Sequence, residues 1–81
     1  IDDRLALVDA AHAALSVSRP QSGWSEQDPM NWIKACDAAI SELAARQGAA
    51  FRMLRGIGLS GQMHGATLLD KDDTPLRPAI L

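Results

Sequence analysis

The chain has 81 residues and a formal net charge of -2, because eight basic and ten acidic residues are scattered along it. Scattered charge leaves no basic stripe for a phosphate backbone and excludes nucleic acid as an expected partner, and a single cysteine excludes an internal disulfide framework. No apolar run approaches the roughly 20 residues that span a bilayer, so we expect a cytoplasmic protein without a membrane partner. A chain of 81 residues forms one domain at most.

The first predicted element covers residues 5–17, which are rich in alanine. Alanine has the highest helix propensity and favours a helix here. At the end of the segment, Leu15 and Val17 alternate with serines, which is the two-residue period of a strand. The pattern alone leaves the element type open. Arg19-Pro20 ends the element, because a residue before proline is kept out of the helical region.

The clearest element is a helix from Pro29 to about Gln47. Asp28 is a natural N-cap, proline fits the first helical position, and Gly48 fits the C-cap. Glu26 lies two residues before Asp28, and we interpret both carboxylates as stabilising the helix start, not as an acid–base pair. Apolar residues recur at steps of three and four, which predicts a buried face made of Trp32, Ile33, Cys36, Ala39, Ile40, Leu43 and Ala44.

Short apolar segments follow this helix. Residues 54–60 predict a buried strand approached closely by another backbone, because glycines are interleaved with Leu and Ile. Residues 66–69 predict a second strand, and the charged turn 70–75 connects it to residues 76–81 in a hairpin. Pro78 cannot donate a hydrogen bond to a ladder, so we expect the last segment to be an edge strand or the start of a strand.

Between these strands lies Gly61-Gln62-Met63-His64-Gly65, which we interpret as a ligand-binding loop. Glycine permits positive φ and the close approach of a backbone. Gln62 and His64 offer hydrogen bonds to hydroxyl groups, and Met63 offers an adaptable apolar surface. This mixture suits a small polyhydroxylated molecule, although a structural His64 and a core-filling Met63 fit the residues alone equally well.

Two further signals are weak. Gly56 to Gly61 has the spacing of a dinucleotide-binding fingerprint, which predicts a helix directly after Gly61, but the next glycine and the charged turn come too soon for that helix. His12, Cys36 and His64 share no metal-ligand spacing. We therefore expect no metal site, and structural roles for His12 and Cys36.

Several motifs carry a resemblance by their order and spacing. They are Ser18-Arg19-Pro20, Trp24-Ser25-Glu26-Gln27-Asp28-Pro29 leading to Trp32, Gly58 to Gly65 followed by Ala66-Thr67-Leu68-Leu69-Asp70, and Leu76-Arg77-Pro78-Ala79-Ile80-Leu81. Together they resemble the FGGY family of carbohydrate kinases, and within it the enzymes that phosphorylate D-xylulose. The resemblance covers nearly the whole chain, and Trp24 to Pro29 and Gly61 to Gly65 are its most specific parts.

The resemblance implies an α/β fold, as a fragment of an actin-like ATPase with a ribonuclease H-like domain. Residues 1–81 would form part of the family's N-terminal domain, without its first strands and without the downstream remainder. Residues 5–17 would then be a strand leading on from a hairpin near Asp2-Asp3. The start at Ile1 and the apolar end at Leu81 agree with a piece of a longer chain.

The resemblance also implies an activity for the intact enzyme, which would use ATP and Mg²⁺ to convert D-xylulose to D-xylulose 5-phosphate. A homodimer would be one arrangement of that enzyme. Met63 and His64 match the family's sugar-contacting residues and are the only positions carried over. No catalytic, nucleotide-binding or metal residue is expected within residues 1–81, so this segment alone should be inactive. The alternatives are another FGGY sugar kinase, such as a gluconokinase or a ribulokinase, and a non-catalytic binding module.

Overall fold

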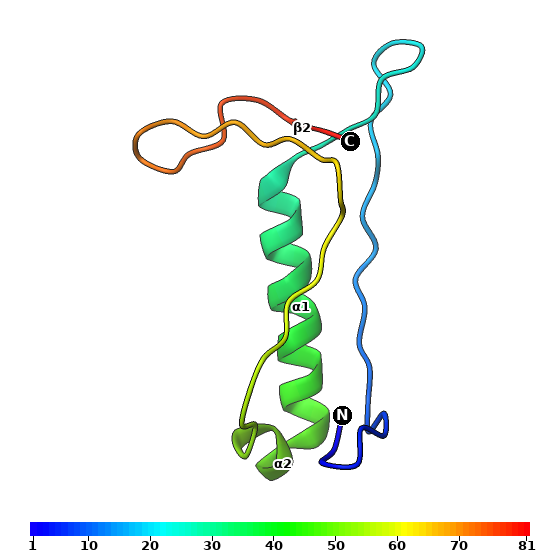
Figure 1. The fold of residues 1–81 in the computed structure, drawn as a ribbon, viewed down its shortest axis with the longest axis vertical. Helices are drawn as coiled ribbons and strands as arrows, with labels where there is room; N and C mark the ends of the chain where they lie inside the picture. Colours follow the sequence, from blue (N-terminus) through cyan, green and yellow to red (C-terminus); the bar gives the residue numbers. More distant parts are fainter.

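One long helix dominates the structure, a computed structural model that describes residues 1–81 (Figure 1). Helix α1 covers Pro29–Gln47, as predicted, and it begins and ends for the predicted reasons. Asp28 has an extended backbone, and its carboxylate accepts a hydrogen bond from the Met30 amide at 2.9 Å. At the other end, Gly48 has a φ of 49°, and its amide donates to the Ala44 carbonyl at 3.0 Å.

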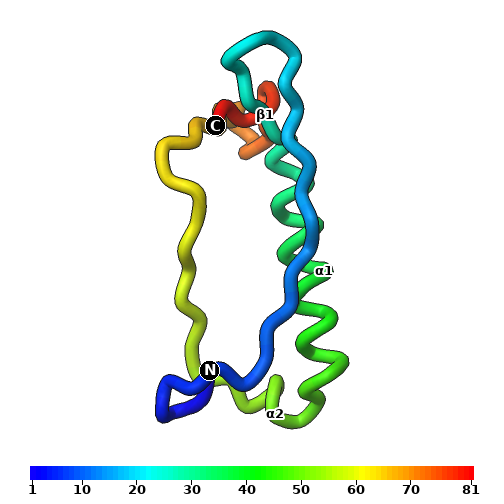
Figure 2. The backbone as a smooth tube through the Cα atoms, turned by 90° about the vertical axis from the view of Figure 1, so that its right-hand side faces the viewer, coloured from blue at the N-terminus to red at the C-terminus, as the bar shows by residue number.

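The predicted apolar face of α1 is only partly covered. Cys36, expected to be structural on this face, is exposed together with Ile33 and Ile40. This part of the prediction is wrong for the chain, because the segment that returns after the short helix α2 (Ala49–Arg52) lies at the opposite edge of the molecule from α1 (Figure 2). The half-buried positions on the face are Trp32, Ala39, Leu43 and Ala44.

The N-terminal segment runs beside α1 as an extended chain (Figures 1 and 2). It starts with a turn in which the Asp2 carboxylate accepts hydrogen bonds from the Arg4 and Ala6 amides, both at 2.9 Å. Residues 5–17 then form no helix, so the propensity of alanine is overridden. They form no ladder either, so the strand expected over residues 5–17 is wrong; the nearest bridge is at Ser18, just after the segment.

Four extended segments meet in one antiparallel row near the start of α1. Its centre is the pair of two-residue strands β1 (Glu26–Gln27) and β2 (Ala79–Ile80). Ser18 pairs with the outer edge of β1, with hydrogen bonds of 2.8 and 2.9 Å in the two directions. Ala66 pairs with the outer edge of β2 in the same way, at 2.8 and 3.0 Å. The row therefore joins four parts of the chain that are distant in sequence.

The predicted hairpin after residue 65 is confirmed. The Asp70 amide donates to the Thr74 carbonyl at 2.9 Å, and the Asp70 carboxylate accepts from the Asp72 and Thr74 amides at 2.8 and 2.9 Å. Leu69 and Pro75 form a bridge that closes this turn. Pro78 lies immediately before β2, as expected for a proline at a strand start.

Residues 54–60 are extended but are not the buried strand that was predicted. They have no strand partner in this chain, and Ile57 and Leu59 are 84% and 94% exposed. The chain as a whole is open: its radius of gyration is 16.0 Å, against about 12 Å for a compact domain of this length. Only three residues are buried, and Ala79 is the one that forms the apolar core. Contacts within residues 1–81 thus leave most apolar side chains uncovered.

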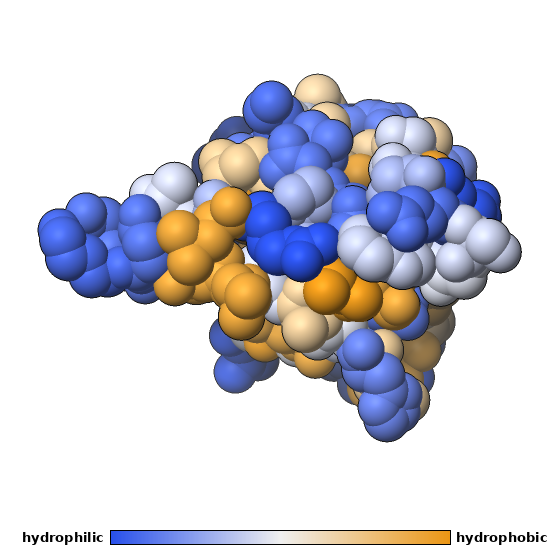
Figure 3. Space-filling model, turned by 90° about the horizontal axis from the view of Figure 1, so that it is seen from above, coloured by the Kyte–Doolittle hydropathy of each residue, from blue (hydrophilic) through white to orange (hydrophobic).

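The surface around the hairpin is hydrophilic in one part and hydrophobic in another. Figure 3 shows a hydrophilic tip projecting from the molecule, with hydrophobic surface directly behind it. The large exposed apolar residues of this hairpin are Leu68, Leu69, Leu76 and Ile80. None of the helices combines the length and the apolar character that crossing a bilayer requires.

Candidate functional site

The five residues from Gly61 to Gly65 form an exposed turn centred on Met63 and His64. We call it the sugar turn, after the ligand that the family resemblance leads us to expect. Its left-handed residue is His64, with a φ of 63°, whereas neither glycine of the turn has positive φ. The left-handed residue of the turn is therefore the histidine and not a glycine, although this conformation costs a non-glycine residue energy. Strain of this kind is found at functional sites more often than elsewhere.

Close packing does not explain the flanking glycines either. A Cβ atom at Gly61 would meet nothing within 4 Å, and one at Gly65 would lie 3.6 Å from the Ile80 carbonyl oxygen, an ordinary contact. Within this chain the two glycines are required neither by positive φ nor by a near backbone. They leave the two sides of the turn open.

The side chains of the turn face solvent. Met63 is 75% exposed and His64 is also exposed, so this chain does not use them as core. Gln62 folds back instead, and its amide nitrogen donates to the Met63 carbonyl at 3.2 Å. Met63 and His64 are thus presented on one turn as an apolar surface beside a hydrogen-bonding ring, which suits one face of a sugar.

The turn is fixed through the strand row on its C-terminal side. Ala66 follows the turn directly and is held by two hydrogen bonds to Ile80 in β2. Ile80 in turn faces Glu26 of β1 in the antiparallel register. The sugar turn is therefore connected to β1 through Ala66 and Ile80.

Glu26 differs from its predicted role. It lies in β1 and is 8% exposed, and its carboxylate accepts a hydrogen bond from Nη2 of Arg77 at 2.6 Å. Asp28 alone caps the helix. Sequence reasoning missed this pair because the partners are 51 residues apart, and no local spacing connects them.

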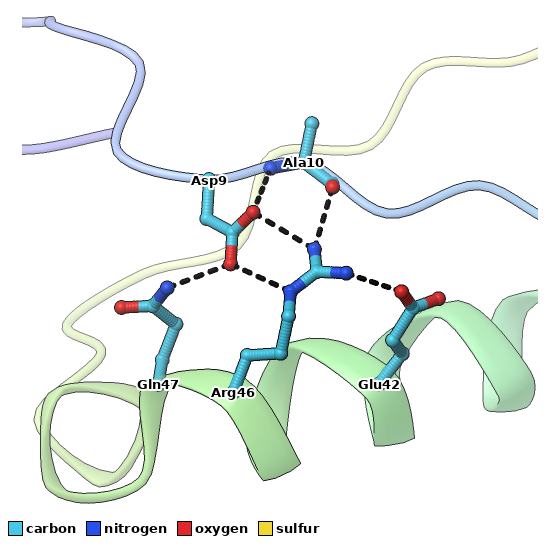
Figure 4. A network of polar contacts seen from close by, with 5 residues as sticks. All are labelled: Asp9, Ala10, Glu42, Arg46 and Gln47. Atoms are coloured by element: carbon cyan, nitrogen blue, oxygen red, sulfur yellow. Dashed lines mark hydrogen bonds and ion pairs between the residues drawn. The ribbon is translucent and has the colours of Figure 1, made fainter.

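A second polar network ties the N-terminal segment to the far end of α1 (Figure 4). Arg46 donates to the Asp9 carboxylate at 2.8 and 3.0 Å, and also to the Ala10 carbonyl and to Glu42. Gln47 donates to the same carboxylate at 2.6 Å. Hydrogen bonds from Arg46, and secondarily from Gln47, lower the pKa of Asp9 from 3.8 to about 2, and the Asp9 carboxylate raises the pKa of Arg46. No local pattern in the sequence points to this network.

His12 and Cys36, for which structural roles were expected, are both exposed in this chain. No group of three His, Cys, Asp or Glu side chains converges as metal ligands would. A hollow of about 760 Å³ lies by α2 and the N-terminus, lined by seven hydrophobic residues among thirteen, and neither Met63 nor His64 is among them. After Gly61 the chain makes a turn where a dinucleotide site would need a helix, which excludes that alternative.

Comparison with known proteins adds a family to this geometry. Residues 1–81 match the model of the N-terminal domain of the FGGY family of carbohydrate kinases. The chain is 53% identical over 75 residues to a xylulose kinase of Klebsiella pneumoniae and 47% identical over 75 residues to one of Escherichia coli K12. These alignments cover 91% and 93% of the chain, which spans 15% of the length of each relative.

The same likeness extends to three dimensions. A crystal structure described as a xyloylose kinase from Brucella ovis has a TM-score of 0.97 to this chain at 60% sequence identity. The match covers 100% of the chain and 17% of that protein. The open arrangement of α1, the extended segments and the sugar turn therefore occurs inside a much longer kinase chain.

Proposed function

Because the chain belongs to the FGGY family of carbohydrate kinases, we propose that the intact protein transfers the γ-phosphoryl group of ATP to the 5-hydroxyl of D-xylulose. The observation that carries this proposal is the likeness to xylulose kinases in both sequence and structure across the chain. A gluconokinase or a ribulokinase is less favoured, because these relatives are xylulose kinases. Membership of a kinase family likewise disfavours a non-catalytic binding module.

Within this activity, Met63 and His64 are proposed to contact the ketose. The support is their exposure on one turn and the left-handed backbone of His64 within that turn. An imidazole nitrogen can donate to or accept from a sugar hydroxyl, and the thioether can pack on the carbon face of the sugar. The role of this segment is thus to bind and orient the acceptor, which is a large part of catalysis in phosphoryl transfer.

The phosphoryl-transfer groups are proposed to lie in other parts of the intact protein. Residues 1–81 contain no converging set of carboxylates that fits a Mg²⁺ ion, and no glycine-rich loop ending in lysine that would hold phosphates. We therefore assign no metal ligand, no nucleotide contact and no catalytic base to this segment. Mg²⁺ and ATP remain requirements of the proposed reaction as a whole.

The proposal also concerns the surroundings of the chain. The family has the actin-like ATPase fold, and we propose that residues 1–81 are part of its ribonuclease H-like N-terminal domain. Exposed apolar residues such as Ile57, Leu59 and Ile40 would then pack against other segments of that domain. A homodimer and a cytoplasmic location of the intact enzyme stay predictions.

The test is a sugar panel on the full-length protein, with ADP release followed in a coupled assay. We expect ATP turnover to be stimulated strongly by D-xylulose and weakly by L-xylulose, D-ribulose and gluconate. In the His64→Ala variant, loss of a hydrogen bond to the sugar should reduce kcat/KM for D-xylulose by roughly 5- to 150-fold, which corresponds to about 1 to 3 kcal/mol. A wild-type kcat/KM in that variant would refute the role of His64, and a preference for gluconate would refute the substrate.

A further inference from the structure

The ion pair between Glu26 and Arg77 is the one place where the chain buries a charge. Side-chain exposure is 10% for Glu26 and 42% for Arg77, and the pair joins β1 to the residue two positions before β2. Burying a charge is costly unless it is paired and hydrogen-bonded. The hydrogen bond from Arg77 to the Glu26 carboxylate, at 2.6 Å, offsets this cost.

β1, which carries Glu26, is held in place by several hydrogen bonds. The Gln27 side chain accepts a hydrogen bond from Nε1 of Trp32 in α1 at 2.9 Å, and donates to the Ser16 carbonyl at 3.1 Å. The neighbouring Glu26 also exchanges two backbone hydrogen bonds with Ser18. β1 is thus tied to the helix and to the N-terminal segment, so its carboxylate has a defined place.

β2, in contrast, is only two residues long and carries the sugar turn at its other edge. Ile80 lies opposite Glu26 on one side, and on the other side it holds Ala66, which directly follows the sugar turn. Two-residue strands provide few backbone hydrogen bonds to resist sliding. The ion pair adds a charge-assisted contact between β1 and the residue two positions before β2.

We propose that Glu26 and Arg77 are a positioning pair for the sugar turn. Their contact fixes the register of β2 against β1 and so determines the position of Met63 and His64. This inference rests on the proposed ketose kinase function. It assigns neither residue to contact with the sugar or with ATP. Its expected signature is an effect on ketose binding that exceeds the effect on ATP binding.

The test compares variants of the full-length protein in steady-state kinetics with D-xylulose and ATP. Arg77→Met keeps the aliphatic stem and removes the donor, and we expect the KM for D-xylulose to rise about tenfold, since small displacements of positioning groups have effects of this size or larger. The KM for ATP should stay at the wild-type value. Arg77→Lys restores a cation and should recover most of the ketose affinity.

Arg46→Met is the matched control, because it removes an ion pair of the same type at the opposite end of α1. It should lower thermal stability while leaving the KM for D-xylulose unchanged. If Arg77→Met does not fold, Glu26→Gln gives the same measurement, since the half-exposed Arg77 left behind can be hydrated. The variant Tm is recorded beside each KM, and ketose binding is measured separately by calorimetry.

The outcomes separate the two proposals. An unchanged KM for D-xylulose in folded Arg77→Met or Glu26→Gln overturns the positioning role, as does an equal rise in both KM values or an equal effect of Arg46→Met. A wild-type protein that phosphorylates no ketose overturns the proposed function, and this inference with it. A selective loss of ketose affinity that Arg77→Lys reverses supports both.

Discussion

Replacing His64 by glycine should separate the two roles that a histidine in a turn can have. With a φ of 63°, His64 occupies the left-handed region, where a non-glycine residue incurs about 1 to 2 kcal/mol relative to its usual conformation. Glycine avoids this cost but loses about 0.5 to 1 kcal/mol more conformational entropy on folding. The difference predicts that His64→Gly is neutral or stabilising by up to about 1.5 kcal/mol.

The same substitution removes the imidazole, so activity should fall while stability does not. Loss of a hydrogen bond to a sugar hydroxyl predicts a decrease in kcat/KM for D-xylulose of roughly 5- to 150-fold. The assays are ADP release with D-xylulose and the Tm of the full-length protein without sugar. Addition of D-xylulose should also raise the Tm of the wild type more than that of the variant, because a ligand stabilises the state to which it binds.

Asp73→Gly is a matched control within the same chain. Asp73 has a φ of 59° in the exposed hairpin turn, so glycine relieves the same backbone strain there without touching the sugar turn. It should shift stability in the same direction as His64→Gly and leave kcat/KM unchanged. The reasoning is refuted if His64→Gly lowers the Tm while ketose kinetics stay at the wild-type level, which is the behaviour of a structural histidine.

Three further predictions concern how the segment is held together. Asp28→Ala should destabilise the protein by about 1 kcal/mol, because the Met30 amide loses its cap, whereas Asp28→Asn should be close to neutral in the same thermal unfolding assay. The pKa of Asp9 is lowered to about 2, so its pairing with Arg46 stabilises the fold above about pH 4 and is lost as the pH falls through 2. The Asp9→Asn variant should therefore show a flatter dependence of stability on pH across that range. A pH profile of stability equal to that of the wild type would contradict this role of Asp9. Asp70→Ala removes two hydrogen bonds from the hairpin turn and should cost about 1 to 2 kcal/mol, measured by chemical unfolding, with no effect on the KM for ATP.

The parts of the fold that could be predicted are those that local sequence determines. The helix from Pro29 to Gln47 has a capping residue directly before its first residue, Asp28, and one directly after its last, Gly48. The hairpin turn after residue 69 follows from an aspartate that hydrogen-bonds amides two and four residues ahead. Short-range chemistry of this kind leaves a readable pattern.

Features that depend on distant partners could not be predicted. Residues 5–17 are extended despite their alanine content, because they lie along α1 and are tied to it by Asp9 and Arg46. The place of Glu26 before Asp28 predicts a helix-start carboxylate, but its partner Arg77 is 51 residues away. The apolar stretch 54–60 signals burial, yet nothing within residues 1–81 covers it. A hydrophobic pattern indicates that a surface is covered, but it does not identify the segment that covers it.

For the candidate site, the sequence selects the candidate residues but does not give their geometry. Met63 and His64 could be selected from their composition and their resemblance to a family motif. The glycines of the turn permit positive φ, but it is His64 that takes the left-handed conformation. Histidine is one of the few non-glycine residues that are enriched there, so the sequence allows either arrangement.

A crystal structure of the full-length protein with D-xylulose bound tests the central claim most directly. We expect an imidazole nitrogen of His64 within about 3.2 Å of a sugar hydroxyl oxygen, with the Met63 thioether packed on the same molecule. A ketose bound elsewhere, with the sugar turn still open to solvent, would contradict the proposal that this turn holds the substrate.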